Sequence, residues 1–329
     1  MTNYTISGSP HVHGKDNTRK IMIDVLIALM PALLVAIYHF GLNALWLTLV
    51  SVFTCVLTEW LIQKFLIKKP STIGDFSAAV TGVLLAFNVP SNLPIWMIVV
   101  GSVVAIGIAK MSFGGLGKNP FNPALVGRVF MLVSFPTAMT TWPASRPITL
   151  GGAAVDAFTG PTPLGMLKEQ GAISCPEYTN ILDLLLGNHG GSFGEVCTIA
   201  LLIGAIYLLC RRVIDIYTPL SILLTVFVFT GICHLVNPEQ YIAPVYHLLY
   251  GGLILGAFFM ATDMVTSPMT VRGKLLFGFG IGVITVVIRL WGAYPEGVSF
   301  SILIMNAFTP LINKAFKPKR FGVVKPSKK

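Results

Sequence analysis

The stretch IMIDVLIALMPALLVAIYH, residues 21–39, is apolar over nearly its whole length and carries one acidic residue, Asp24, near its beginning. A bilayer core about 30 Å thick is crossed by roughly 20 apolar residues in a helix. The stretch therefore predicts a membrane-spanning helix. The polar residues 1–20 before it contain no apolar core of a signal peptide, so we expect them to be retained and the first span to direct insertion.

The composition extends this interpretation to most of the chain. Of 329 residues, 54% are hydrophobic and 11% are charged, whereas a soluble domain carries about 25% charged residues. The mean hydropathy is +0.77. The five cysteines include no Cys-x-x-Cys pair, so the sequence predicts neither an iron–sulfur cluster nor another metal site. These features exclude an ordinary soluble enzyme and indicate an all-α integral membrane protein.

Further apolar runs of similar length raise the expected number of spans to ten. The expected spans are 21–39, 43–63, 72–88, 94–110, 122–139, 195–211, 217–236, 246–264, 274–291 and 298–314. They divide the chain into an N-terminal segment (1–20), a first five-helix unit (21–139), a polar loop (140–194), a second five-helix unit (195–314) and a basic tail (315–329).

Basic residues gather in alternate loops, and this bias sets the orientation of membrane helices. They precede the first span and follow the second, fourth, sixth, eighth and tenth, while the intervening loops hold only Arg146 and Lys168. We expect both termini to be cytoplasmic and the loop 140–194 to lie outside. The net charge of +10 then reports topology and favours contact with anionic lipid, not with nucleic acid.

The two units resemble each other weakly. AAVTGVLLAF (78–87) aligns with YGGLILGAFF (250–259), and residues 108–125 align with 288–304. Because five spans is an odd number, a second copy enters the membrane in the opposite sense. The sequence therefore predicts two inverted five-helix repeats, an arrangement that usually places a binding site or pathway between the halves.

Nucleotide-binding motifs are not supported. The run GGLGKN (114–119) lacks the Ser or Thr that follows the lysine of a phosphate loop. The glycines at 278, 280 and 282 do not fit a dinucleotide fingerprint and are typical of close helix packing. No nucleophile–base–orienter triad is visible either. The sequence therefore predicts no catalytic residue.

NPFNPA, residues 119–124, suits a helix start, since Asn is a good N-cap and Pro a good first residue. Asn122 then either caps a helix at the cytoplasmic surface or places a helix N-terminus against a bound anion or carbonyl.

Ionisable residues within the apolar runs are costly and suggest function. They are Asp24, Glu59, Asp75, Arg128, Asp263 and Arg289. We regard Glu59, Asp75 and Asp263 as candidates for an ion path and Arg128 as a paired or ligand-facing residue.

Several stretches resemble a known family, that of the D subunit of the Rnf complex and the B subunit of the sodium-pumping NADH:quinone reductase. The matching residues are Ser9-Pro10-His11, LGKNPFNPA (116–124), SFP (134–136), MTTW (139–142) and DAFTGPTPLG (156–165). The resemblance covers essentially the whole chain. Only about twenty residues precede the first span, and this short segment favours the Rnf D subunit.

The resemblance implies a covalent flavin. The family's motif Asp-x-x-Ser/Thr-Gly-Ala-Thr carries FMN on its last threonine as a phosphoester, installed by a separate flavin transferase. Asp156, Thr159 and Gly160 match the motif, Thr162 is the implied acceptor, and Pro161 replaces alanine. Gly160 lets the backbone approach a phosphate, and an exposed loop makes the hydroxyl accessible to the transferase.

The family further implies a membrane subunit that passes electrons coupled to Na⁺ or H⁺ transport in the inner membrane of a bacterial cell, together with the other subunits of its complex. It also implies a second, non-covalent flavin (riboflavin), for which Asn122, Arg128 and the repeat counterpart around Asn306 are our candidate residues. Alternatives are a B-type subunit of the NADH:quinone reductase, a non-redox channel or transporter with inverted repeats, and a structural scaffold. Flavin content separates the redox from the non-redox alternatives.

Overall fold

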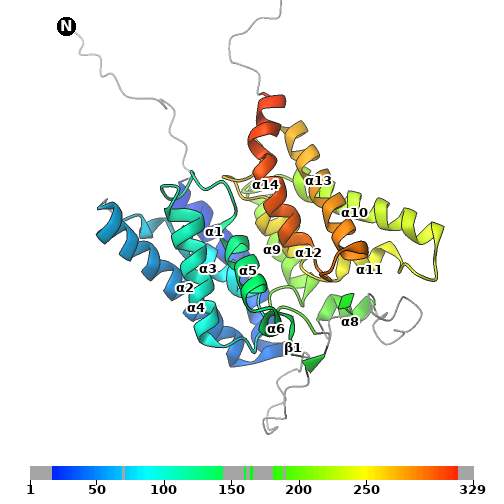
Figure 1. The fold of residues 1–329 in the computed structure, drawn as a ribbon, viewed down its shortest axis with the longest axis horizontal. Coiled ribbons are helices and arrows are strands. Elements are labelled where there is room, and N and C mark those ends of the chain that lie inside the picture. The colour runs from blue at the N-terminus through cyan, green and yellow to red at the C-terminus, as the bar shows by residue number, and fades with distance from the viewer. Residues whose placement is uncertain are drawn as a thin grey trace, which may run out of the picture.

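The computed structural model describes residues 17–68, 71–143, 159–160, 164–165, 181–187 and 190–317. Within them the chain is predominantly helical (Figure 1). The elements of the first half are α1 (Thr18–Phe40), α2 (Leu42–Leu61) continued by the π-helix η1 (Ile62–Ile67), the 3₁₀ turn η2 (Ile73–Asp75), α3 (Ser77–Phe87), α4 (Ile95–Val103) continued by the π-helix η3 (Val104–Met111), α5 (Pro123–Ser134) and α6 (Pro136–Thr140).

The second half follows two short strands, β1 (Trp142–Pro143) and β2 (Thr159–Gly160). Its elements are α8 (Ile181–Leu186), α9 (Thr198–Cys210), α10 (Tyr217–Val236), α11 (Pro244–Leu249), α12 (Leu253–Leu255) continued by the π-helix η6 (Gly256–Met260), α13 (Val271–Trp291) and α14 (Val298–Ala315).

Five helices in the described part of the chain are long and apolar enough to cross a membrane: Thr18–Phe40, Leu42–Ile67, Tyr217–Val236, Val271–Trp291 and Val298–Ala315. Four shorter apolar helices accompany them: Ser77–Phe87, Ile95–Met111, Pro123–Ser134 and Thr198–Cys210. Large apolar side chains such as Leu34, Phe53 and Leu224 point outward and are at least 60% exposed, as lipid-facing residues are. The structure is that of a multi-pass membrane protein.

Three expected spans are shorter or interrupted. The expected span 72–88 is α-helical only from Ser77, after the 3₁₀ turn η2. The expected span 122–139 breaks at Phe135, because the residue before a proline is disfavoured in the α conformation. The expected span 246–264 breaks between α11 and α12, where Gly251 has a φ of +71°. Glycine adopts this left-handed conformation without strain.

The two halves lie side by side and meet through corresponding elements (Figure 1). The first helix of one half, α1, packs on the first helix of the other, α9, and α5 packs on α14. At the α1–α9 crossing, a Cβ on Gly204 would lie 2.0 Å from the carbonyl oxygen of Ala28. The start of α1 and the end of α14 lie toward one end of the molecule, and α6, β1 and α8 lie toward the other.

Candidate functional site

The segment that resembles a flavinylation motif is only partly described. Asp156 and Thr162 lie outside the described residues, so the acceptor assignment stays a prediction. Thr159 and Gly160 form β2, which pairs antiparallel with β1 through Trp142 opposite Gly160 and Pro143 opposite Thr159. This pairing holds the backbone of these two motif residues against the chain that leaves α6.

Arg128 lies on α5 and is paired with residues of the other half. Its Nη2 atom is 2.8 Å from Oε2 of Glu296, and its Nη1 atom donates to Oγ of Ser299. The second oxygen of Glu296 accepts a hydrogen bond of 2.6 Å from the backbone N–H of Gly252. Burial alone would raise the pKa of Glu296, but the guanidinium groups of Arg128 and Arg289 outweigh it and hold that pKa below its ordinary value. Glu296 is therefore an ionised partner of Arg128.

Two further ionisable side chains, Arg289 and Glu195, lie close enough to Glu296 to interact with it electrostatically. Arg289 on α13 is buried and donates to the carbonyl oxygens of His247, at 2.5 Å, and Tyr250, at 3.0 Å. Glu195, which precedes α9, is buried and accepts a 3.1 Å hydrogen bond from the backbone N–H of Ser192. Arg289 is one of the candidates expected from the sequence, whereas no role was predicted for Glu296 or Glu195. Glu296 directly precedes the last span, and an acid at such a helix start is a signal that could have identified it.

A cavity of about 320 Å³, which we call the outer cavity, lies beside Arg128 and Glu296. Aromatic side chains form much of its remaining wall: Trp142 of β1, Tyr294 and Phe300. Gly165, which follows the motif, also lines it. The cavity is therefore adjacent to Gly165 and to Trp142, the strand partner of Gly160.

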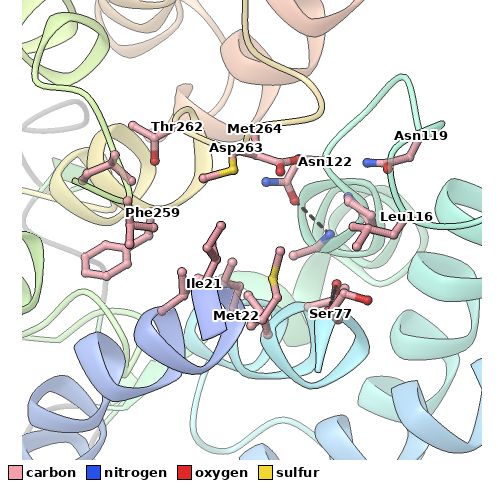
Figure 2. A pocket seen from close by; sticks show the side chains of 18 of the residues that line it. Ile21, Met22, Ser77, Leu116, Asn119, Asn122, Phe259, Thr262, Asp263 and Met264 are labelled. Carbon is pink, nitrogen blue, oxygen red and sulfur yellow. Dashed lines mark hydrogen bonds between the residues drawn. The ribbon is translucent and has the colours of Figure 1, made fainter. Parts of the chain in front are cut away.

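A second cavity of about 90 Å³, the inner cavity, lies between α1, α3, the start of α5 and the chain around η6 (Figure 2). Asn122 lines it and caps α5, with Oδ1 accepting from the backbone N–H groups of Ala124 (3.1 Å) and Leu125 (3.4 Å). This confirms the expected helix start. Its Nδ2 donates across the halves to the carbonyl of Met260 at 3.2 Å.

Asn119 lines the same cavity with an unused acceptor. Its Nδ2 donates to the carbonyl of Phe121 at 3.1 Å, while its buried Oδ1 has no hydrogen-bond partner in the described part of the chain. Buried polar atoms are rarely left unpaired, so Oδ1 marks a place for a ligand or water. Asn122 and Arg128, which we considered together for a second flavin, line different cavities.

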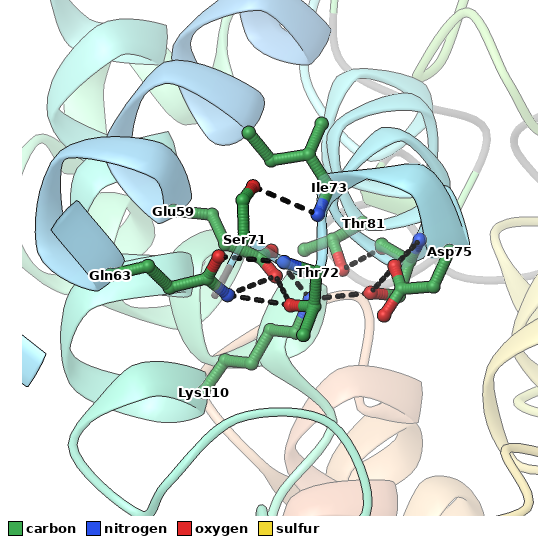
Figure 3. Close-up of polar contacts among 9 residues, drawn as sticks. Glu59, Gln63, Ser71, Thr72, Ile73, Asp75, Thr81 and Lys110 are labelled. Atoms are coloured by element: carbon green, nitrogen blue, oxygen red, sulfur yellow. Dashed lines mark hydrogen bonds and ion pairs between the residues drawn. The ribbon is translucent and has the colours of Figure 1, made fainter. Parts of the chain in front are cut away.

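Glu59 is not an exposed interfacial charge but belongs to a buried network (Figure 3). Its side chain is 1% exposed, and its Oε2 lies 2.7 Å from Nζ of Lys110. Its Oε1 accepts from Gln63 at 3.1 Å and from Thr72 at 3.0 Å. From the sequence, Lys110 is expected to mark the cytoplasmic side as a basic residue after a span, but its side chain is 2% exposed.

The three acids that we considered for an ion path lie near one another. Nζ of Lys110 also donates to Oγ of Ser77 at 2.6 Å, and that hydroxyl donates to Oδ1 of Asp75 at 2.6 Å, so Glu59 and Asp75 share one network. Asp263 faces the inner cavity, which Lys110 and Ser77 also line (Figure 2). Its carboxylate accepts from the backbone N–H of Val265 at 3.4 Å and the hydroxyl of Thr266 at 3.2 Å. Among the ion pairs of the described residues, none involves Asp263.

Comparison with known proteins places the chain among relatives of the same length. It is 48% identical over 328 residues to the D subunit of the Na(+)-translocating ferredoxin:NAD(+) oxidoreductase complex of Acetobacterium woodii, covering 99% of this chain and 98% of that protein. It is 43% identical to the D subunit of the proton-translocating ferredoxin:NAD(+) oxidoreductase complex of Clostridium ljungdahlii, covering 97% of this chain and 96% of the relative.

A third relative, the D subunit of the ion-translocating oxidoreductase complex of Stutzerimonas stutzeri, is 37% identical over 94% of this chain and 93% of its own length. The model of the NQR2, RnfD, RnfE family matches residues 5–322. With a family match over nearly its whole length and three relatives covered almost end to end, the chain belongs to the NQR2, RnfD, RnfE family.

Proposed function

We propose that the chain is the D subunit of an ion-translocating ferredoxin:NAD⁺ oxidoreductase complex. The observation that carries this proposal is the 48% identity, over 99% of the chain, to a relative with that name. The chain works as one membrane subunit among others, and the overall reaction belongs to the assembled complex. One relative is named for sodium and another for proton translocation, so both ions are kept as candidates for transport.

The membrane arrangement proposed is ten spans in two inverted repeats, residues 21–139 and 195–314, joined by an outer loop. Contacts between α1 and α9 and between α5 and α14 support it, because a pseudo-twofold axis brings equivalent elements of two repeats together. The start of α1 and the end of α14 lie at one end of the molecule (Figure 1), as two cytoplasmic termini require. The basic-loop pattern assigns that end to the cytoplasmic face of the inner membrane.

The outer loop carries FMN on Thr162 in this proposal. Asp156, Thr159 and Gly160 provide the motif. In support, Gly160 pairs with Trp142, which lines the outer cavity. When bound, the flavin supplies one- and two-electron transfer, while the protein positions it and tunes its potential. A flavin transferase is therefore a maturation partner.

A non-covalent flavin, riboflavin, is proposed for the inner cavity. Asn119 offers its unpaired Oδ1 to a donor such as a ring N–H or a ribityl hydroxyl, and Asn122 fixes the start of α5 beside it. The cavity of about 90 Å³ is below the roughly 300–1,000 Å³ of typical ligand pockets. Binding therefore requires neighbouring side chains to move apart. Arg128 has no part in this site.

Ion transport is proposed to pass the inner cavity. Asp263 faces that cavity and has no cationic partner in the described part of the chain, whereas Glu59 is already neutralised by Lys110 and Asp75 is held by Ser77. Asp263 is therefore the acid best placed to bind a cation in transit. Glu59 and Asp75 contribute through the charge and hydrogen bonds of their shared network.

Covalent flavin in a denaturing gel tests the proposal. The protein should be co-expressed with a flavin transferase, and its band should then fluoresce under ultraviolet light, because a phosphoester survives denaturation while a non-covalent flavin is lost. Thr162→Val should abolish the fluorescence while preserving side-chain shape. Thr159→Ser should retain it, and Asp156→Ala should weaken it.

Two outcomes of this experiment would redirect the assignment. A fluorescent Thr162→Val band would contradict Thr162 as acceptor, and peptide mass analysis would then locate the linkage. A wild-type protein that is colourless after purification and non-fluorescent in the gel would favour a channel or transporter instead.

A further inference from the structure

Glu195 is a buried acid without a directly bound cation. It is 5% exposed. Its Oε1 accepts the 3.1 Å hydrogen bond from the backbone N–H of Ser192, whereas its buried Oε2 has no hydrogen-bond partner in the described part of the chain. None of the ion pairs among the described residues includes it. A buried carboxylate that lacks both a cation and a full set of hydrogen bonds is costly, and the neutral carboxyl avoids most of that cost.

A second carboxylate approaches the same glycine as Glu195. The backbone N–H of Gly252 donates to Oε1 of Glu296 at 2.6 Å. A Cβ at Gly252 would lie 2.8 Å from Oε2 of Glu195 and 3.8 Å from Oε2 of Glu296, so the two carboxyl groups flank one point. Glu296 is the ionised partner of Arg128. Because two carboxyl groups that share a site do not both ionise readily, Glu195 is the one that keeps a proton.

Two guanidinium groups face this acid pair. Arg128 on α5 and Arg289 on α13 each interact electrostatically with both acids. Arg128 uses its Nη2 for Glu296 and its Nη1 for the hydroxyl of Ser299, and the Nη atoms of Arg289 donate to backbone carbonyl oxygens. Neither guanidinium therefore neutralises Glu195 by direct contact.

Buried polar atoms without partners gather around the pair. They are Oε2 of Glu195, Nε of Arg128, Nε of Arg289 and Nδ1 of His247, which have no hydrogen-bond partner within the described residues. All four residues are at most 6% exposed. Such atoms are rarely left unpaired, and water molecules commonly supply the missing partners. Donors and acceptors placed around a buried acid in this way suit a proton that arrives through water.

We propose that Glu195 binds a proton and exchanges it through the outer cavity, with Glu296 as the neighbouring carboxylate that stabilises the proton-bound form. Uptake forms an O–H bond at Oε2, and release returns the proton to water, so no other bond changes. Glu296 and Arg128 also line the outer cavity, which connects the site to it. A metal cation fits less well, because Arg128 and Arg289 already place two positive charges there. The proposed topology puts the start of α9, and with it Glu195, toward the outside.

Infrared spectroscopy of the full-length protein in detergent detects the bound proton directly. A protonated carboxyl has a C=O stretching band that an ionised carboxylate lacks, and this band moves to lower frequency in D₂O. At neutral pH the native protein should show the band, and Glu195→Gln should lose the contribution of one carboxyl. Glu239→Gln is the matched control and should leave the band unchanged, because Glu239 is exposed and exposed glutamates are ionised at neutral pH.

A pH titration of the same band tests the role of Glu296. The contribution of Glu195 should disappear reversibly as the pH is raised. In Glu296→Gln, measured against the double variant with Glu195→Gln, it should disappear at a lower pH, because the neighbouring negative charge that favours the protonated form is gone.

Thermal unfolding gives a second measurement. Glu195→Gln should unfold at the temperature of the native protein, since an amide replaces a neutral carboxyl without a change of charge. Glu296→Gln should unfold at a lower temperature, because it leaves the buried guanidinium of Arg128 without its anion.

Identical infrared spectra for the native protein and Glu195→Gln at neutral pH would mean that Glu195 is ionised, and would overturn the proton site. The same conclusion would follow if Glu195→Gln failed to fold or unfolded at as low a temperature as Glu296→Gln, because the cluster would then depend on the negative charge of Glu195. An unchanged pH dependence in Glu296→Gln would overturn the part assigned to Glu296.

Discussion

At the level of single residues, the buried charges carry most of the functional information. Lys110 and Glu59 form an ion pair that is almost completely removed from solvent. Arg128 and Glu296 form another, with side chains 7% and 12% exposed. Removing two charges from water is expensive and is offset only by good geometry and further hydrogen bonds. Both pairs have such bonds, through Gln63 and Thr72 in the first case and Ser299 and Gly252 in the second.

Lys110→Met should destabilise the protein by about 3–5 kcal/mol, because it leaves the carboxylate of Glu59 buried without its cation. Adding Glu59→Gln should restore most of the loss, since the amide still hydrogen-bonds to Gln63 and Thr72. Unfolding of the purified protein in detergent measures both effects. Lys274→Met is the matched control: its partner Asp215 is 55% exposed, and such surface pairs contribute about 0–1 kcal/mol. Equal losses for Lys110→Met and Lys274→Met would contradict the importance assigned to the buried pair.

Asp263→Asn should reduce ion transport several-fold per electron transferred, while flavin content and stability stay near those of the unchanged protein. The reason is that Asp263 faces the inner cavity and that its carboxylate, with no ion pair in the described structure, contributes a charge that a passing cation can use. Ion uptake by vesicles containing the whole complex measures this. Asp75→Asn, which weakens the hydrogen bond to Ser77, is the comparison. Unchanged coupling in Asp263→Asn would exclude this residue from the path.

At the level of helices, close contacts between backbones join the two halves. Gly204 of α9 lies directly against the backbone of Ala28 on α1, because a Cβ at residue 204 would be 2.0 Å from the Ala28 carbonyl oxygen. Small residues allow such approaches between membrane helices. The α1–α9 contact is one of the principal connections between the halves, so its spacing affects the inner cavity, which both helices line.

Gly204→Ala should destabilise the protein by about 1–3 kcal/mol, the usual cost of overpacking, because the two helices must move apart. Gly231→Ala on α10 is the matched control, since the nearest atom to its Cβ would be 3.9 Å away. Alanine in an open helical position is favoured over glycine by about 0.5–1 kcal/mol. Thermal unfolding in detergent compares the two variants. A Gly204→Ala protein as stable as Gly231→Ala would show that the α1–α9 crossing adjusts freely.

Helices and their termini could be predicted from the sequence better than their interruptions and partners. Apolar length predicted the long helices, and Asn122-Pro123 predicted the start of α5 correctly. The break at Phe135 follows from Pro136, and the break at Gly251 from a paired glycine. Both signals were present but were obscured by the continuous apolar character of the spans. The pairing of Arg128 with Glu296, 168 residues apart, depends on how the halves pack, which a local pattern does not encode.

At the level of the whole molecule, the two cavities lie in different surroundings. The inner cavity lies between α1, the start of α5 and the chain after η6. The outer cavity lies beside β1 and the start of α14. α5 connects them, with Asn122 at the inner cavity and Arg128 at the outer one. A single short helix, Pro123–Ser134, therefore separates the two cavities.

The proposed topology places α8 outside and the end of α14 in the cytoplasm. Single cysteines introduced at Asp183 and Lys317 in a cysteine-free background should react differently with an impermeant maleimide in intact cells. Asp183 is in α8, and Lys317 is an exposed residue just after α14. We expect labelling of the cysteine at 183 without permeabilisation, and labelling of the one at 317 only after it. α8 and the end of α14 lie at opposite ends of the molecule (Figure 1). The basic residues that follow the even-numbered spans assign the end of α14 to the cytoplasm. Labelling of both cysteines from outside would contradict the ten-span arrangement and would remove the reason for placing the flavin loop outside. Labelling of the cysteine at 317 from outside, and of the one at 183 only after permeabilisation, would invert the membrane orientation and leave the fold intact.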